Sequence, residues 1–231
     1  NVLKSMEENT VYNIVFSSSC CVYGQPEKLP VSENTPFKKA DSPYAESKQV
    51  SEQIIKDFTR SHNNISSVSL RYFNPVGAHE SALIGELPKG IPDNLVPYIT
   101  QTATGIREGL SVFGKDYNTH DGTAIRDYIH VEDLAKAHLK AFNFLNDSED
   151  KNIYEFFNVG TGIGYSVLDV INSFENVNNL KLNYSFKDRR DGDIEKIYSD
   201  VIKSKKVLKW EPERSLDDMM SSAWKWQKNL K

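Results

Sequence analysis

Residues 17–24 read Ser17-Ser18-Ser19-Cys20-Cys21-Val22-Tyr23-Gly24, directly after the apolar run Asn13-Ile14-Val15-Phe16. A second stretch, Ser42-Pro43-Tyr44-Ala45-Glu46-Ser47-Lys48, opens a run of helical periodicity that continues to Phe58. Proline is tolerated in the first turn of a helix, and serine is a favoured N-cap. These patterns predict a strand at residues 11–18, a loop at 24–42 and a helix at 43–60, with the serines facing the helix across a cleft.

Tyr44 and Lys48 lie four residues apart, so they share one face of the predicted helix. A phenol titrates near pH ~10, and a neighbouring ammonium favours its ionised form. A pKa of about 7 needs roughly 4 kcal/mol of differential stabilisation, at about 1.4 kcal/mol per unit. Ser19 is then placed to bind a substrate hydroxyl and to relay its proton to Tyr44. A Tyr-x-x-x-Lys pattern alone also fits an ordinary surface helix, but the upstream serines favour a catalytic face.

These stretches together resemble the extended short-chain dehydrogenase/reductase family, and within it the enzymes that epimerise nucleotide sugars at C4. The resemblance continues through Leu70-Arg-Tyr-Phe-Asn-Pro-Val-Gly-Ala-His79, Gly90-Ile-Pro-Asp-Asn-Leu95, Asp121-Gly-Thr-Ala-Ile-Arg-Asp-Tyr-Ile-His130, Arg189-Arg-Asp-Gly-Asp193 and Trp224-Lys-Trp226. It implies an NAD-dependent isomerase that oxidises a UDP-hexose to a 4-keto sugar and reduces it again, interconverting UDP-galactose and UDP-glucose in galactose metabolism. It also implies that Ser19, Tyr44 and Lys48 are catalytic and contact NAD.

Members of this family begin with a strand, a Gly-x-x-Gly-x-x-Gly turn and a helix that together hold the dinucleotide pyrophosphate. This sequence contains no such turn, and Asn1–Met6 is typical of the tail of a helix. By the resemblance, the N-terminal Gly-rich part is absent. We therefore expect a segment that keeps the catalytic half, lacks most of the NAD cradle and is inactive by itself.

Helices and strands alternate along the chain, which is typical of a doubly wound α/β sheet. Beyond residue 60, the patterns predict strands at 68–72, 110–114, 127–130, 154–159 and 180–186, and helices at 95–107, 131–145, 166–174, 200–208 and 216–227. We expect residues 1–75 to form the C-terminal part of an NAD-binding Rossmann domain. Residues 76–231 are expected to form a smaller α/β domain that binds the UDP-sugar, with 126–145 packing back on the Rossmann part.

Three residues near predicted element ends are candidates for ligand contact. Asn74 follows a strand end, where open α/β sheets bind ligands, but it also fits a simple cap of the Asn-Pro turn. Phe73 is placed either to pack on the nicotinamide or to join the core. Asn94 precedes a predicted helix and fits as its cap, whereas the family resemblance implies a substrate contact.

The resemblance implies further substrate contacts in the second half of the chain. It assigns Arg126 and Arg190 to the diphosphate and Asp193 to the ribose, which suits a guanidinium fork and a carboxylate. A structural ion pair of Arg126 with the neighbouring Asp121 or Asp127 is the alternative.

Two more positions complete the expected substrate site. The segment Ser111-Val112-Phe113 resembles the backbone that receives uracil. Ile197 takes the place beside the 2-substituent of the hexose, or else packs in the core. Its branched side chain predicts a preference for UDP-galactose and UDP-glucose over the N-acetyl sugars.

Composition excludes few classes of protein but sets limits on partners. The net charge of -4 gives no indication of a nucleic-acid or anionic membrane partner, and no apolar run approaches the ~20 residues of a membrane span. Adjacent Cys20 and Cys21 form neither a disulfide framework nor a metal spacing, which favours a cytoplasmic enzyme. We interpret His79, His120 and His130 as structural and expect no metal. The family pairs through helices that include 43–60, so we expect a homodimer.

Two other functions stay open. Sugar 4,6-dehydratases and UDP-glucuronate decarboxylases of the same family carry Asp-Glu or Glu after the catalytic Ser/Thr, where this chain has Cys20 and Cys21. A thiol cannot replace a carboxylate in that role. The second alternative is a non-catalytic nucleotide-sugar binder derived from a truncated gene, against which the retained Ser19, Tyr44 and Lys48 argue.

Overall fold

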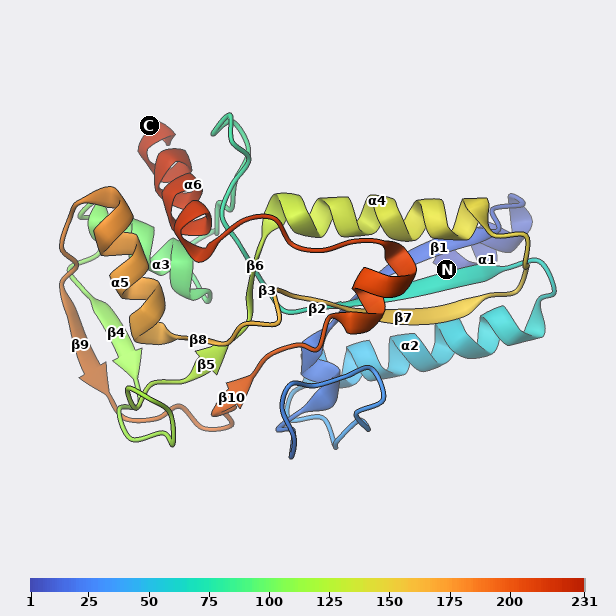
Figure 1. Cartoon of the computed structure of the whole chain (residues 1–231), viewed down its shortest axis with the longest axis horizontal. Coiled ribbons are helices and arrows are strands. Elements are labelled where there is room, and N and C mark those ends of the chain that lie inside the picture. Colours follow the sequence, from blue (N-terminus) through green and yellow to red (C-terminus); the bar gives the residue numbers. More distant parts are fainter. Residues whose placement is uncertain (231) are drawn as a thin grey trace.

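A computed structural model describes residues 1–230 (Figure 1). Its central sheet consists of three parallel strands in the order β1–β2–β7, where β1 is Asn13–Ser19, β2 is Ser66–Tyr72 and β7 is Tyr154–Val159. Nearly every residue of β2 is buried, as expected for a strand covered on both faces. Helix α2 (Pro43–Ser61) covers one side of this sheet and α4 (Val131–Asp147) the other.

A local signal fixes where the long helix α2 begins. Helix α2 begins at Pro43 because the Ser42 hydroxyl accepts a hydrogen bond from the Ala45 backbone N–H at 3.1 Å. A short helix α1 (Val2–Glu8) precedes β1, and the 3₁₀ turn η1 (Cys20–Tyr23) follows it. The predicted strand and helix of this region are therefore found within two residues of their expected bounds.

A second group of elements lies on the left of Figure 1. Helices α3 (Leu95–Ala103), α5 (Val167–Asn178) and α6 (Leu216–Asn229) pack beside the parallel pair β4 (Leu110–Phe113) and β9 (Tyr184–Lys187). Their shared core includes Ile99, Val112, Ile171, Phe174 and Met220.

Short strands connect the two groups. β3 (Asn74–Val76) pairs with β6 (Tyr128–His130), and β5 (Ile125–Arg126) lies between β8 (Tyr165–Ser166) and β10 (Lys196–Ile197). A π-helical turn, η2 (Ser204–Leu208), precedes the last helix. Because β3 follows β2 directly, the end of the central sheet leads into this connecting region.

Segments beyond residue 75 also belong to the central sheet and its core: α4 lies mostly within the 126–145 segment expected to pack back on the Rossmann part, whereas β7 lies outside it. Strand β7 pairs with β2 along its whole length, and α4 contributes Leu134, Ala141 and Leu145 to the core under that sheet. Trp210 packs into the same core. We therefore propose that the Rossmann part is built from several segments of the chain, with residues of α4, β7 and η2 joining residues 1–73.

Three expected elements differ in extent. The helix predicted at 95–107 ends at Ala103, since Gly105 adopts a φ of +77°. The strand predicted at 180–186 starts only at Tyr184, because the backbone N–H of Leu182 donates to the Glu175 carboxylate instead of a strand partner. The helix predicted at 200–208 is largely reduced to η2, which ends where Lys209 takes a left-handed φ of 51°.

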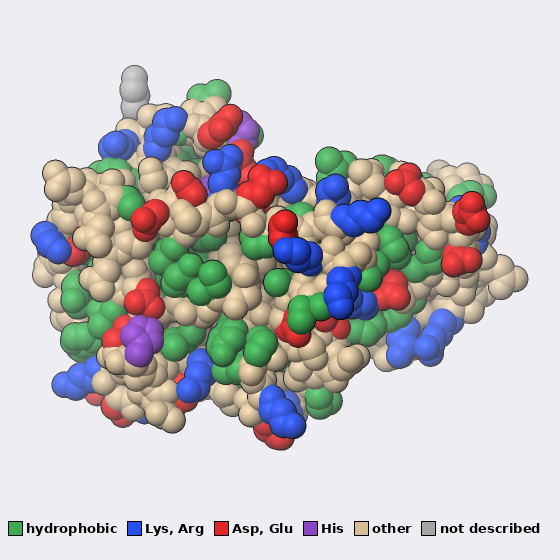
Figure 2. All heavy atoms as spheres, viewed as in Figure 1, with side chains coloured by type: hydrophobic (Ala, Val, Ile, Leu, Met, Phe, Trp, Pro, Cys, Tyr) green, Lys and Arg blue, Asp and Glu red, His purple; other side chains and the backbone are tan. Residues whose placement is uncertain are grey.

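The surface is mixed in charge. Figure 2 shows Lys and Arg side chains interspersed with Asp and Glu side chains over the face that it draws. Within residues 1–230, none of the helices has both the length and the apolar character that crossing a membrane requires.

Candidate active site

Ser19, Tyr44 and Lys48 meet at the carboxyl end of β1. Strand β1 ends at Ser19, whose hydroxyl accepts a hydrogen bond from the Cys21 backbone N–H at 3.3 Å. Tyr44 stands in the first turn of α2 and is 54% exposed. The Lys48 ammonium donates to the Ser17 carbonyl oxygen at 2.9 Å and lies 5.4 Å from the centroid of the Tyr44 ring. This edge of a parallel sheet is where ligands bind in open α/β folds.

The residues of this chain raise the pKa of the Tyr44 phenol. Partial burial is the main cause, and a hydrogen bond with Ser19 opposes it only in part. Within residues 1–230, Lys48 does not offset this burial: its ammonium lies over the ring and is bonded to a carbonyl oxygen. A phenolate at neutral pH needs a positive charge from outside this set of residues.

A buried polar network lies directly beneath the catalytic face. Glu52 and Arg71 are 2% and 4% exposed, and Arg71 Nη2 donates to Glu52 Oε2 at 2.6 Å. Glu52 also accepts a hydrogen bond from the hydroxyl of Ser18, the residue before Ser19. Glu52 continues the helix face of Tyr44 and Lys48 at the next i+4 position. In the sequence, this i+4 spacing indicates that Glu52 lies on the same helix face as Tyr44 and Lys48. It does not identify Arg71 as the ion-pair partner of Glu52.

The network continues to β7 through a tyrosine. Arg71 Nη1 donates to the Tyr23 hydroxyl at 3.1 Å, and Tyr23 donates to Asn158 Oδ1 at 2.6 Å. Burial alone would lower the pKa of Arg71, but its hydrogen bonds with Glu52 raise it overall, so the guanidinium stays charged. The strand end that carries Ser19 is thus tied to α2, β2 and β7 at once.

A cavity of about 490 Å³ opens beyond the end of β2. Its size is in the range of small-molecule sites. It is lined by Asn74, Ile91, Pro92, Asp93, Asn94, Leu95, Tyr98, Leu110, Ser111, Phe113, Ala124, Arg126, Tyr128, Val167, Arg190 and Asp193. The structure therefore brings most of the predicted substrate residues to one place, and it adds Tyr98 and Tyr128, which the motifs alone did not single out.

Arg126 forms an ion pair across the cavity wall. Its Nη2 donates to Asp193 Oδ1 at 2.7 Å, with both side chains partly exposed. The predicted alternative, a pair with Asp121 or Asp127, is wrong because both carboxylates have other partners. Asp127 is fully buried and accepts hydrogen bonds from Thr161 and Ser199, and burial raises its pKa.

The two predicted asparagines contact the cavity in different ways. Asn94 does not use its side chain to cap α3; its Nδ2 donates to Glu86 Oε1 at 2.8 Å. Asn74 lies in β3, where its backbone N–H donates to the Asp127 carbonyl oxygen at 3.0 Å. Both asparagines line the cavity, so a ligand contact by either side chain stays a prediction that its position favours.

The side chains of residues 111–113 point alternately to the two sides of β4. Ser111 and Phe113 line the cavity, whereas Val112 is buried in the core on the other side of the strand. The Arg190 guanidinium lies 3.9 Å from the centroid of the Phe113 ring. Val112 can thus offer a ligand only its backbone.

Phe73 and Ile197 lie in the core. They are 4% and 2% exposed and belong to one buried cluster with Val22, Tyr23 and Val31. Neither residue lines the cavity. The structure favours the core alternative for both side chains, and the effect of Ile197→Cys on substrate preference tests it for Ile197.

The two cysteines that follow Ser19 are free thiols. Burial raises the pKa of Cys20 to about 12 and also raises the pKa of Cys21. Both side chains are therefore neutral at physiological pH and supply no anionic acid–base group beside Ser19.

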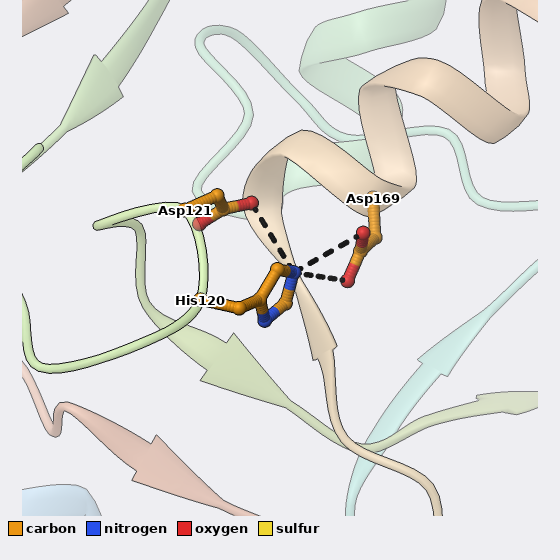
Figure 3. Close-up of side chains that lie close together, drawn as sticks. All are labelled: His120, Asp121 and Asp169. Atoms are coloured by element: carbon orange, nitrogen blue, oxygen red, sulfur yellow. Dashed lines mark hydrogen bonds and ion pairs between the residues drawn. The ribbon is translucent and has the colours of Figure 1, made fainter.

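The histidines have structural contacts. Figure 3 shows His120 between Asp121 and Asp169, with its Nε2 at 3.5 and 3.3 Å from their carboxylate oxygens. Asp121 also accepts a hydrogen bond from the Ser166 hydroxyl, and Asp169 completes the capping box of α5. These contacts hold the loop that carries His120 onto the start of α5. His130 bonds to Ser222, and His79 lies 3.6 Å from Glu132.

A parallel α/β sheet with Ser19, Tyr44 and Lys48 at its carboxyl edge is the arrangement of the nucleotide-binding doubly wound folds. The chain belongs to the NAD dependent epimerase/dehydratase family, whose sequence model matches residues 1–160. The family resemblance predicted from the motifs is thereby confirmed.

Two curated relatives and one solved structure are similar to nearly the whole of this chain. The chain is 48% identical over 226 residues to the UDP-glucose 4-epimerase of Drosophila melanogaster and 51% identical over 227 residues to that of Pasteurella multocida. Each alignment covers 98% of this chain but 64% and 66% of the relative. The crystal structure of the Stenotrophomonas maltophila UDP-glucose-4-epimerase, with bound NAD and formylated UDP-arabinopyranose, is 44% identical and superposes with a TM-score of 0.95. That alignment covers 98% of this chain and 66% of the other, so this chain spans about two thirds of its relatives.

Proposed function

We propose that the protein interconverts UDP-galactose and UDP-glucose in an NAD-dependent reaction. The observation that carries the proposal is the cluster of Ser19, Tyr44 and Lys48 at the end of β1, next to a strand that leads straight into the cavity of about 490 Å³. Relatives at 48% and 51% identity are UDP-glucose 4-epimerases, which supports the same chemistry here.

The donor set at this edge suits a dinucleotide. Lys48 has three N–H groups, and the one hydrogen bond described for them within residues 1–230 goes to Ser17, so the other two are available to a ribose. The Tyr44 phenol is more than half exposed on the same side. Ser19, Tyr44 and Lys48 would hold NAD at this edge, and the bound dinucleotide would supply reversible hydride transfer at C4 of the sugar.

The residues of this chain handle the proton of the 4-hydroxyl. Ser19 binds that hydroxyl and relays its proton to the Tyr44 oxygen, and the proton returns by the same route. Lys48 holds the cofactor ribose and adds positive charge beside the phenol. The network of Ser18, Glu52 and Arg71 holds the Ser19 strand end and the Tyr44 helix in register.

The cavity recognises the UDP part of the substrate. Arg126 and Arg190 face the diphosphate with guanidinium groups, and Asp193 accepts from ribose hydroxyls. Backbone groups of 111–113 face the uracil, while Asn74 and Asn94 contact the sugar or its phosphate.

The experiment follows formation of UDP-glucose from UDP-galactose by the purified protein in its full-length form, supplied with NAD, because residues 1–231 alone are expected to be inactive. Wild type is expected to reach the same mixture from either sugar, and Tyr44→Phe is expected to abolish conversion while UDP still binds. Tyr12→Phe, at an exposed tyrosine before β1, is the matched control. A wild-type protein that binds both NAD and UDP yet converts neither sugar contradicts the proposal and favours the non-catalytic binder.

Assembly and location form a further part of the proposal. We propose a homodimer that pairs through α2, because Val50 and Ile54 are about half exposed on that helix. Ile54→Glu is expected to shift the protein to monomer in analytical ultracentrifugation, and an unchanged sedimentation coefficient contradicts this interface. We also propose a cytoplasmic location, which the two free adjacent cysteines support.

A further inference from the structure

Two turns lie side by side where the parallel strands β4 and β9 end. Phe113 pairs with Lys187 in the last register position, and the Gly114 backbone N–H donates to the Lys187 carbonyl oxygen at 2.9 Å. Figure 1 shows both strands at the left of the molecule, running in the same direction. Residues 114–117 and 188–190 therefore leave the strand pair together.

The two consecutive arginines of the second turn point to different rings. The Arg190 guanidinium stacks on Phe113 at the cavity wall, at 3.9 Å from the ring centroid. The Arg189 guanidinium lies 4.1 Å from the centroid of the Tyr117 ring, outside the cavity lining. Arg189 therefore faces the first turn, whereas Arg190 lines the ligand site.

Arg189 is held at several points. Its Nε donates to Asp116 Oδ1 at 2.8 Å, and its Nη2 donates to the Asp116 carbonyl oxygen at 2.5 Å. For Arg190, the contact described within residues 1–230 is the stack on Phe113. The arginine with the hydrogen bonds to its neighbouring turn is thus the one that does not face the cavity.

The turn that receives Arg189 is tightly built. Tyr117 is 6% exposed, and its backbone N–H donates to the Gly122 carbonyl oxygen at 3.0 Å. Gly114 has a φ of +78°, and a Cβ there would lie 2.3 Å from Cε2 of Tyr117. The ring under Arg189 therefore packs against backbone that only glycine allows.

We propose that Arg189 is a positioning residue that fixes Arg190 over the cavity to bind the diphosphate of a nucleoside diphosphate. This inference rests on the proposed function, because it takes the cavity as a UDP site. Clamping Arg189 to Asp116 and Tyr117 orders the 188–190 segment before the ligand arrives. The ordering cost that a loose side chain incurs on binding is then avoided, which corresponds to about a 2- to 10-fold gain in affinity.

The test is a double-mutant cycle on ligand affinity. Calorimetry measures the dissociation constants of UDP and of uridine, which lacks the diphosphate. Arg189→Ala is expected to weaken UDP binding by about 2- to 10-fold and to leave uridine binding unchanged. In an Arg190→Ala background the same change is expected to have no further effect, because Arg189 acts only through Arg190.

Two further variants separate positioning from simple electrostatics. Asp116→Ala removes a negative charge, so electrostatics alone predicts tighter UDP binding, whereas loss of the clamp predicts weaker binding. Lys115→Ala removes a positive charge from the same turn; within residues 1–230 Lys115 has no ion pair, and we expect no effect beyond that of one distant charge. Thermal unfolding verifies that every variant is folded.

The outcomes distinguish an error in the proposed diphosphate site from an error in the role of Arg189 alone. If Arg190→Ala leaves UDP binding unchanged, the diphosphate site of the proposed function is wrong, and the positioning role with it. If Arg190→Ala weakens UDP binding but Arg189→Ala does not, only the positioning role is wrong. Additive losses in the double variant, equal losses for uridine, or tighter UDP binding by Asp116→Ala also overturn the positioning role.

Discussion

Removing the Glu52 carboxylate is the perturbation whose effect on stability is best defined by this structure. Arg71 Nε and Nη2 donate to the two Glu52 oxygens at 2.9 and 2.6 Å, inside a site where both side chains are almost fully buried. Glu52→Gln keeps the shape but leaves the Arg71 charge without its counter-charge. Breaking a buried pair in this way costs about 3–5 kcal/mol of the free energy of unfolding.

The aromatic rings around Arg71 limit the loss. Its guanidinium lies 4.3 Å from the centroid of Phe156 and 4.7 Å from that of Phe37, and its bond to Tyr23 remains. Cation–π contacts of this kind stabilise a buried cation by about 2 kcal/mol. We therefore expect Glu52→Gln to lie near about 3 kcal/mol, which lowers Tm by roughly 6–12 °C for a chain of this size.

Urea denaturation followed by circular dichroism measures this loss. Glu46→Gln, on the exposed face of the same helix, is the control and is expected to change stability little. Replacing both partners by apolar residues, Glu52→Leu with Arg71→Met, is expected to give a protein more stable than either single variant. A loss below about 1 kcal/mol for Glu52→Gln, or strictly additive effects in the double variant, would refute the reasoning.

Three further outcomes are expected. Ser19→Ala should retain measurable epimerase activity but lose about 10²–10⁴-fold in kcat, because it removes a proton relay and not the Tyr44 base; kinetics indistinguishable from wild type would contradict the relay. Burial raises the pKa of Tyr128 to about 12, so the unfolded chain, titrating near 10.0, loses protons first as pH rises. The folded protein should then lose up to about 3 kcal/mol between pH 10 and 12, a loss that Tyr128→Phe should reduce and Tyr12→Phe should not; equal alkaline curves for the two variants would rule this out. Ile197→Cys should lower stability and leave the ratio of kcat/KM for UDP-galactose and its N-acetyl analogue unchanged, since Ile197 packs in the core; a changed ratio would return Ile197 to the sugar pocket.

The sequence alone determined the features that depend on neighbours a few residues apart. Tyr44 and Lys48 share a helix face because i and i+4 positions always do, and the Ser42 cap sets where that helix begins. Their placement beside Ser19 followed from the motif spacing. The parallel α/β class and the family followed from the alternation of elements and from the motifs.

Only the tertiary structure decided which distant residues are partners. Arg126 pairs with Asp193, 67 residues away, and not with the aspartates beside it in the sequence. Glu52 on α2 pairs with Arg71 on β2, and β7 joins the first sheet from beyond the expected boundary. Periodicity records which face of an element is buried, but it does not record what lies against that face.

Burial decided in the same way which of the predicted site residues line the cavity and which lie in the core. Ser111 and Phe113 face the cavity while Val112 between them faces the core, as the two-residue repeat of a strand requires. Phe73 and Ile197 have side chains that suit either a ligand pocket or a core. The packing of η1, β10 and the 24–42 loop around them encloses both, and the local sequence carries no signal for that enclosure.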